Sequence, residues 1–66
     1  MYINGMRLMR LRVAKGISQY QVSVDTGIPR ITINRIESGR IKNPLFGSAA
    51  RLAEYYGITL DSLKQE

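Results

Sequence analysis

Two arginines, an asparagine and an isoleucine lie close together between residues 30 and 35. The forked guanidinium groups of Arg30 and Arg35 can pair bidentately with guanine, and the amide of Asn34 can pair with adenine. An exposed Ile31 could cover the methyl group of thymine. These side-chain types therefore predict a surface that reads base edges in double-stranded DNA.

A helical wheel places these side chains on one face. Successive residues of a helix are rotated by about 100° around its axis. If the helix from Pro29 to Ser38 buries Ile33 and Ile36, its other residues divide into an inner and an outer face. The outer face holds Ile31, Asn34, Arg35 and Ser38, and Arg30 flanks it in the first turn. Glu37 falls near the inner face, where an unpaired carboxylate would be costly, so we expect it to pair with Arg12.

Few residues of this chain could support catalysis or bind a metal ion. The chain has no cysteine and no histidine, which excludes the usual zinc sites and the Ser-His and Cys-His nucleophiles. The carboxylates are dispersed, with no pair spaced like a catalytic dyad: Asp25, Glu37, Glu54, Asp61 and Glu66. The sequence predicts no enzyme, no metal and no cofactor.

The net charge of +5 is concentrated in two blocks. Residues 1–15 carry four basic and no acidic side chains, and residues 28–43 carry four basic side chains and one acidic one. Such blocks predict a polyanionic partner, either nucleic acid or an acidic membrane surface. No apolar run is long enough to span a bilayer and no signal-peptide pattern follows Met1, so we expect a cytoplasmic protein.

Glycines and capping residues divide the chain into five expected helices. They cover about 5–15, 18–26, 29–38, 45–56 and a short segment after Thr59 that carries Leu60 and Leu63. In the first helix, Met6, Met9 and Val13 recur at helical spacing and predict the buried stripe, broadened by Leu8 and Leu11. We therefore expect one all-α domain over residues 1–66, with no strand.

The second and third helices have the dimensions of a helix-turn-helix unit. Ser18 and Gln21 predict a capping box, and Ile17 with Val22 a hydrophobic staple, at the start of the second helix. Gly27 ends it after about eight residues, and Pro29 opens the third helix. In such a unit the second of the two helices lies in the major groove of DNA.

Further polar side chains could contact phosphates around this unit. Free N–H groups at the start of the second helix suit a phosphate, and a basic loop follows the third helix. The predicted phosphate contacts are Ser18, Gln19, Thr32, Ser38, Arg40, Lys42 and Asn43.

Four segments together resemble the lambda-repressor-like, Cro/repressor-type helix-turn-helix regulators of the xenobiotic-response-element class. The segments are LRVAKGISQYQV, GIPRITINRIESGR, NPLFGSAARLA and YYGITLDSL, and the resemblance runs from about residue 7 to residue 63. It implies a five-helix domain that binds an operator as a two-fold dimer, in a bacterial or phage nucleoid.

The resemblance also implies roles for single residues. Gln19 resembles a glutamine that contacts phosphate or braces a reading side chain, and Arg12 with Glu37 resembles an internal salt bridge. Arg30, Ile31 and Arg35 match base-reading positions, and Thr32 with Asn34 matches positions that contact phosphate or base. The chain departs from the family pattern at Ser23, Val24 and Thr26 in the second helix, which leaves the packing of that helix open.

These patterns favour a transcriptional regulator, most simply a repressor, that binds a palindromic operator as a homodimer. Exposed apolar residues near the end of the chain, Tyr55, Leu60 and Leu63, are the expected dimer contact, which Tyr2 and Ile3 could join. One alternative is a protein-interaction module, such as an antitoxin or an anti-repressor, although its outward helix face would favour aromatic anchors. RNA binding is the weakest alternative, because aromatic residues are not interleaved with the basic ones.

Overall fold

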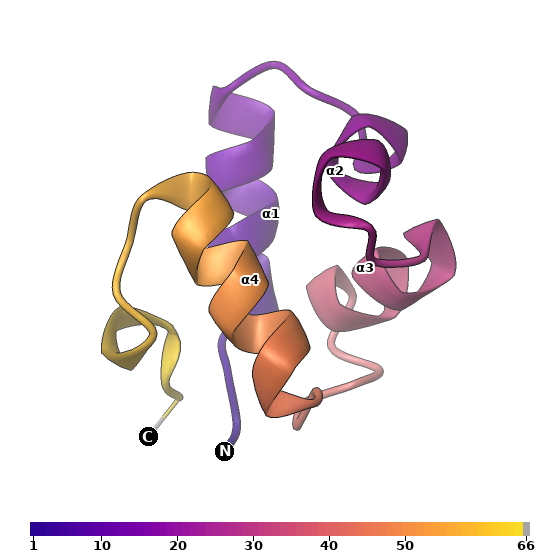
Figure 1. Ribbon diagram of the computed structural model, residues 1–66. Coiled ribbons are helices and arrows are strands. Elements are labelled where there is room, and N and C mark those ends of the chain that lie inside the picture. The colour runs from indigo at the N-terminus through magenta and orange to yellow at the C-terminus, as the bar shows by residue number, and fades with distance from the viewer. Residues whose placement is uncertain (66) are drawn as a thin grey trace.

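Four α-helices and one short 3₁₀ helix make up the computed structural model, which describes residues 1–65 (Figure 1). The helices are α1 (Gly5–Ala14), α2 (Gln19–Thr26), α3 (Arg30–Glu37) and α4 (Phe46–Tyr56). The expected fifth α-helix is instead the three-residue 3₁₀ helix η1 (Asp61–Leu63). None of the helices over residues 1–65 is long and apolar enough to cross a membrane.

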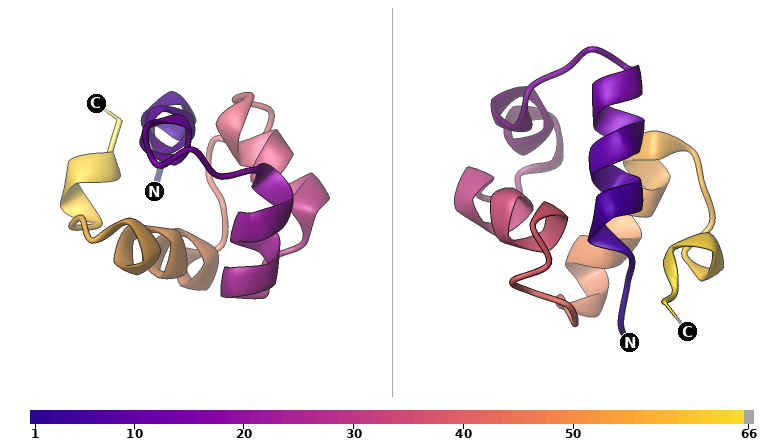
Figure 2. Two further views of the ribbon diagram at one scale, coloured as in Figure 1. Left: turned by 90° about the horizontal axis from the view of Figure 1, so that it is seen from above. Right: turned by 180° about the vertical axis from the view of Figure 1, so that it is seen from behind.

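Helix η1 is short because the residue that follows it, Lys64, pairs with the segment before α1. Thr59 Oγ1 accepts from the Ser62 N–H at 3.2 Å, so the expected cap does start the turn. Lys64 then adopts an extended conformation and forms an isolated antiparallel bridge with Ile3. Asn4 N–H donates to the Leu63 carbonyl at 2.7 Å. These contacts bring the two ends of the chain side by side (Figures 1 and 2).

Helix α1 buries a different face from the one its periodicity predicts. Gly5 and Leu8 are buried and Leu11 packs against the core, whereas Met6 and Val13 are 50% and 60% exposed. The predicted stripe is therefore wrong at Met6 and Val13 and confirmed at Leu8 and Leu11. Gly5 packs so closely on α3 that a Cβ atom there would lie 1.9 Å from the carbonyl oxygen of Ile36. This backbone contact orients the helix, and apolar residues elsewhere on α1 remain in water.

Helix α2 begins and ends at the expected residues. The Gln21 N–H donates to Ser18 Oγ at 3.0 Å, but the Gln21 side chain binds Asp25 instead of returning to Ser18, so only half of the capping box forms. Thr26 is buried and donates from Oγ1 to the Val22 carbonyl at 2.7 Å, while Oγ1 accepts from the Ile28 N–H. The hydroxyl is thus satisfied internally, which explains how a polar residue replaces an aliphatic one here.

Helices α2 and α3 are joined by only three residues, 27–29, with Gly27 in the left-handed conformation at φ 76°. Ile33 and Ile36 on α3 are each 1% exposed, which matches the helical wheel. They pack with α1 and α4 around one core (Figure 2). The buried apolar residues of that core are Ile3, Leu8, Val22, Ile28, Ile33, Ile36, Ala49, Leu52, Ala53, Tyr56 and Leu63.

Burial of the chain ends corrects the expected dimer contact. Leu63 and Ile3 are core residues, because the terminal pairing folds both of them under α1 and α4. Neither residue is available to a partner subunit. Tyr55 and Leu60 are half-buried and pack against the same core.

Candidate nucleic-acid interface

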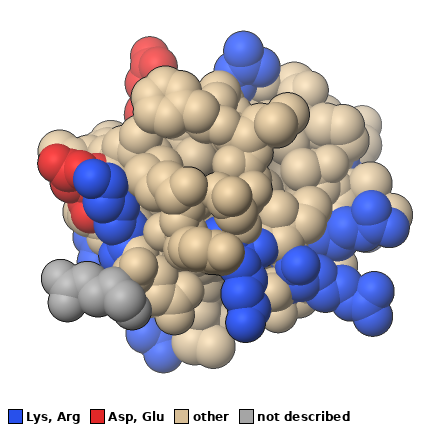
Figure 3. Space-filling model, turned by 90° about the horizontal axis from the view of Figure 1, so that it is seen from below, with Lys and Arg blue, Asp and Glu red and all other residues tan. Residues whose placement is uncertain are grey.

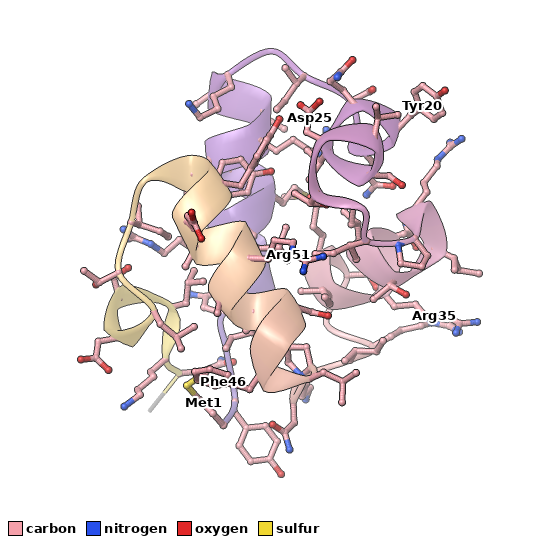
Figure 4. All side chains as sticks on the ribbon, viewed as in Figure 1. Met1, Tyr20, Asp25, Arg35, Phe46 and Arg51 are labelled. Carbon is pink, nitrogen blue, oxygen red and sulfur yellow. The ribbon has the colours of Figure 1, made fainter. Side chains whose placement is uncertain are left out.

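The outer face of α3 is open to solvent along its length. Arg30, Asn34 and Arg35 are exposed, and Ile31 is 58% exposed although it is apolar. Figure 4 shows Arg35 extending away from the rest of the molecule. Ser38 is also exposed, at the end of the helix, where its hydroxyl donates to the Arg35 carbonyl at 3.2 Å.

A shallow hollow between α2 and α3 gathers several of these side chains. Its lining consists of Gln19 from the first turn of α2 together with Arg30, Ile31 and Asn34 from α3. Asn34 Nδ2 donates to Gln19 Oε1 at 3.4 Å across the hollow. The structure therefore brings three of the four predicted base-reading residues next to one predicted phosphate contact.

An ion pair lies next to Gln19, which lines this hollow. Arg12 donates from Nε to Glu37 Oε2 at 2.9 Å and from Nη2 to Glu37 Oε1 at 3.1 Å. The hydrogen bond to Glu37 raises the pKa of the Arg12 guanidinium above its ordinary value. Arg12 Nη1 also donates to the Ile17 carbonyl at 2.9 Å, so the pair joins α1, α3 and the start of α2.

Gln19 connects the ion pair to the outer face of α3. Its Nε2 donates to Glu37 Oε1 at 3.0 Å, while its Oε1 accepts from Asn34. The sequence predicted that Glu37 lies near the core and pairs with Arg12, but it did not predict the hydrogen bond between Gln19 and Glu37. The only signal was the wheel position of Glu37 at the edge of the buried face, and a wheel does not show which residue of another helix lies opposite.

The loop after α3 alternates between buried and exposed side chains. Ile41 packs against the core, and its N–H donates to the Arg35 carbonyl at 3.0 Å. Arg40 and Lys42 on either side of it are exposed. Asn43 is also exposed and accepts a hydrogen bond from the Met1 amino group at 2.7 Å. Thr32 is half-buried and lines a second hollow with this loop.

Charge is unevenly distributed on the surface. In the view from below, Lys and Arg side chains extend from the lower part and from the side on which α3 lies, and acidic side chains lie toward the opposite edge (Figure 3). The acidic residue of α3, Glu37, is buried against Arg12 and does not oppose this positive surface. An anionic partner would therefore meet basic and amide groups at α3.

Two eight-residue helices joined by three residues, the second with its polar face free, define the molecule as a helix-turn-helix protein. A family model described as helix-turn-helix matches residues 8–63, and the chain belongs to this family, in the lambda-repressor- and Cro-like class of xenobiotic-response-element type. The family consists of DNA-binding regulators. Searches of curated proteins and of solved structures returned no match.

Proposed function

We propose that this protein is a sequence-specific transcriptional repressor that binds a palindromic operator as a homodimer, with α3 in the major groove. The observation that carries the proposal is the outer face of α3, which leaves two arginines, an asparagine and an isoleucine in solvent. These are groups that match guanine, adenine and thymine in the major groove. A repressor needs no more than occupation of the operator.

Base reading falls to Arg30, Ile31, Asn34 and Arg35 under this proposal. Phosphate contacts fall to residues that flank the reading face on both sides, namely Ser18, Gln19, Thr32, Ser38, Arg40, Lys42 and Asn43. Support comes from the exposed side chains of the loop after α3 and from the first N–H groups of α2, which have no carbonyl partner within their helix. Contacts of this kind hold the protein in register on the duplex.

The homodimer requires a contact surface other than the buried chain ends. Leu45 and Phe46 are 81% and 70% exposed and directly follow the basic loop that carries Arg40 and Lys42. A two-fold dimer must hold two α3 helices about 34 Å apart on one side of the DNA. A contact surface next to the DNA-facing loop suits that geometry, so we place the dimer contact at Leu45 and Phe46.

Selection of duplexes from a random pool tests the proposal. We expect a palindrome whose half-sites are centred about one helical turn apart. Retention of all sequences alike at moderate salt would contradict sequence-specific binding.

Two substitutions separate base reading from phosphate contact. Arg35→Ala should relax the base preference at one pair of each half-site by about 5- to 150-fold and leave other positions unchanged. Lys42→Ala should weaken binding to all duplexes alike and reduce the salt slope by about 1. Lys64→Ala, which removes a lysine paired with Asp61 and outside the proposed phosphate contacts, is the control for charge alone. Unchanged discrimination in Arg35→Ala would show that α3 does not read the operator as proposed.

A further inference from the structure

A continuous row of hydrogen bonds runs from the ion pair to the outer face of α3. Arg12 donates to Glu37, Gln19 Nε2 donates to Glu37 Oε1 at 3.0 Å, and Asn34 Nδ2 donates to Gln19 Oε1 at 3.4 Å. Asn34 is the one exposed member, and the Glu37 side chain retains only 5% of its exposure. The row thus begins at a shielded charge and ends at a proposed base-reading residue.

The chemistry of these groups allows only one direction for the row. An ionised carboxylate accepts hydrogen bonds and cannot donate, so Gln19 must turn its NH₂ group toward Glu37. Its oxygen then points toward Asn34, which must turn its own NH₂ group to meet it. Charge-assisted bonds are stronger than neutral ones, and shielding from water strengthens them further. Glu37 therefore sets the orientation of two amides, the second of which it does not touch.

We infer that Glu37 and Gln19 are positioning residues that fix the amide of Asn34 in the orientation that reads adenine. This inference rests on the proposed operator binding by α3. One N–H of Asn34 is held by Gln19, which leaves its second N–H and its Oδ1 side by side for the major groove. Adenine presents an acceptor at N7 and a donor at N6, whereas guanine presents two acceptors. The outward donor and acceptor of Asn34 match adenine. With guanine, Asn34 Oδ1 would face another acceptor oxygen.

Removal of the charge of Glu37 gives one test. Glu37 Oε1 accepts from Gln19 Nε2 and also from Arg12 Nε and Nη2, so in Glu37→Gln the oxygen of the new amide should keep this place. The hydrogen bond to Gln19 is then neutral and weaker, and it holds the amides of Gln19 and Asn34 less firmly. We expect the preference for adenine at this position to fall by up to about 5-fold, the low end of what a bidentate contact contributes.

Gln19→Met tests the link without changing the ion pair. We expect it to lower the adenine preference as Asn34→Ala does, and the two substitutions together should lower it no further than Asn34→Ala alone. Gln21→Met is the matched control, because Gln21 is an exposed glutamine of α2 whose side chain binds Asp25 instead. Circular dichroism should establish that each variant is folded before binding is measured.

Competition among four operators that differ only at the position relaxed by Asn34→Ala gives the readout. An adenine preference that survives both Glu37→Gln and Gln19→Met would overturn the inference while leaving operator binding intact. A parent protein that selects no operator at all would instead contradict the proposed function. The position read by Arg35 should keep its preference in every variant, and loss there would also count against a role specific to Asn34.

Discussion

At the scale of single residues, Tyr56 links the core to the Arg12–Glu37 ion pair. Its side chain is buried at the end of α4, with its ring edge-on to Tyr55 at a centroid distance of 5.0 Å and an interplanar angle of 79°. Burial, with a smaller contribution from the negative charge of Glu37, raises the pKa of Tyr56 from 10.0 to about 12. The phenol is therefore held neutral in the folded protein.

This raised pKa predicts a loss of stability in alkali. Because the folded pKa lies above the unfolded one, the contribution of Tyr56 to the free energy of unfolding is complete below pH 10 and is lost as the pH rises through about 12. Urea unfolding of Tyr56→Phe should lack this part of the pH dependence. Tyr2→Phe, at an exposed tyrosine, should behave as the parent protein does. Equal slopes between pH 10 and 12 in the parent and in Tyr56→Phe would disprove the assignment.

At the scale of elements, two glycines within helices differ in how much space surrounds them. Gly5 in α1 allows the close approach to α3, since a Cβ atom there would overlap the Ile36 carbonyl group. Gly47 in the first turn of α4 has nothing within 4 Å of the place where its Cβ atom would lie. An added Cβ atom therefore overlaps backbone atoms at Gly5 and enters open space at Gly47.

Alanine at these two positions should shift stability in opposite directions. Gly47→Ala should raise the free energy of unfolding by up to about 1 kcal/mol, because alanine is the better helix former. Gly5→Ala should lower it by about 1–3 kcal/mol, the usual cost of overpacking, since α1 must move away from α3. Thermal or urea unfolding measures both. A stabilised Gly5→Ala protein would show that the approach of the two helices is looser than the structure has it.

At the scale of the whole molecule, exposed apolar residues around Phe46 support the proposed dimer contact. Phe46 and Met1 both lie at the lower end of the molecule in Figure 4, and the Met1 amino group binds Asn43 in the loop before α4. Tyr2, next to Met1, is also exposed. Apolar side chains from the start of the chain and from the start of α4 thus flank the basic loop, as the proposed dimer on one face of DNA requires.

Phe46→Ser should weaken the proposed dimer and, with it, operator binding. Sedimentation velocity over a range of concentrations should show a shift toward monomer, and operator affinity should fall more than affinity for a single half-site. Val24→Ser is the matched control, since Val24 is 58% exposed on α2, outside the proposed contact. If Phe46→Ser dimerises as the parent protein does, or if Val24→Ser loses the dimer equally, the contact lies elsewhere.

Much of the helix-turn-helix unit follows from the sequence alone, because the signals are local. The start of α2 at Ser18, its end at Gly27 and the burial of Ile33 and Ile36 depend on caps, backbone conformation and helical period within a few residues. The outward position of Arg35 follows from the same period. These features were predicted without knowledge of any neighbouring element.

Tertiary structure alone decided which surfaces meet. The buried face of α1 depends on how closely Gly5 approaches α3, and the burial of Ile3 and Leu63 depends on pairing between residues about sixty positions apart. The contact of Gln19 with Glu37 likewise joins two helices. A one-dimensional pattern shows which residues share a face of one helix, but contacts between distant segments arise only when the whole core packs.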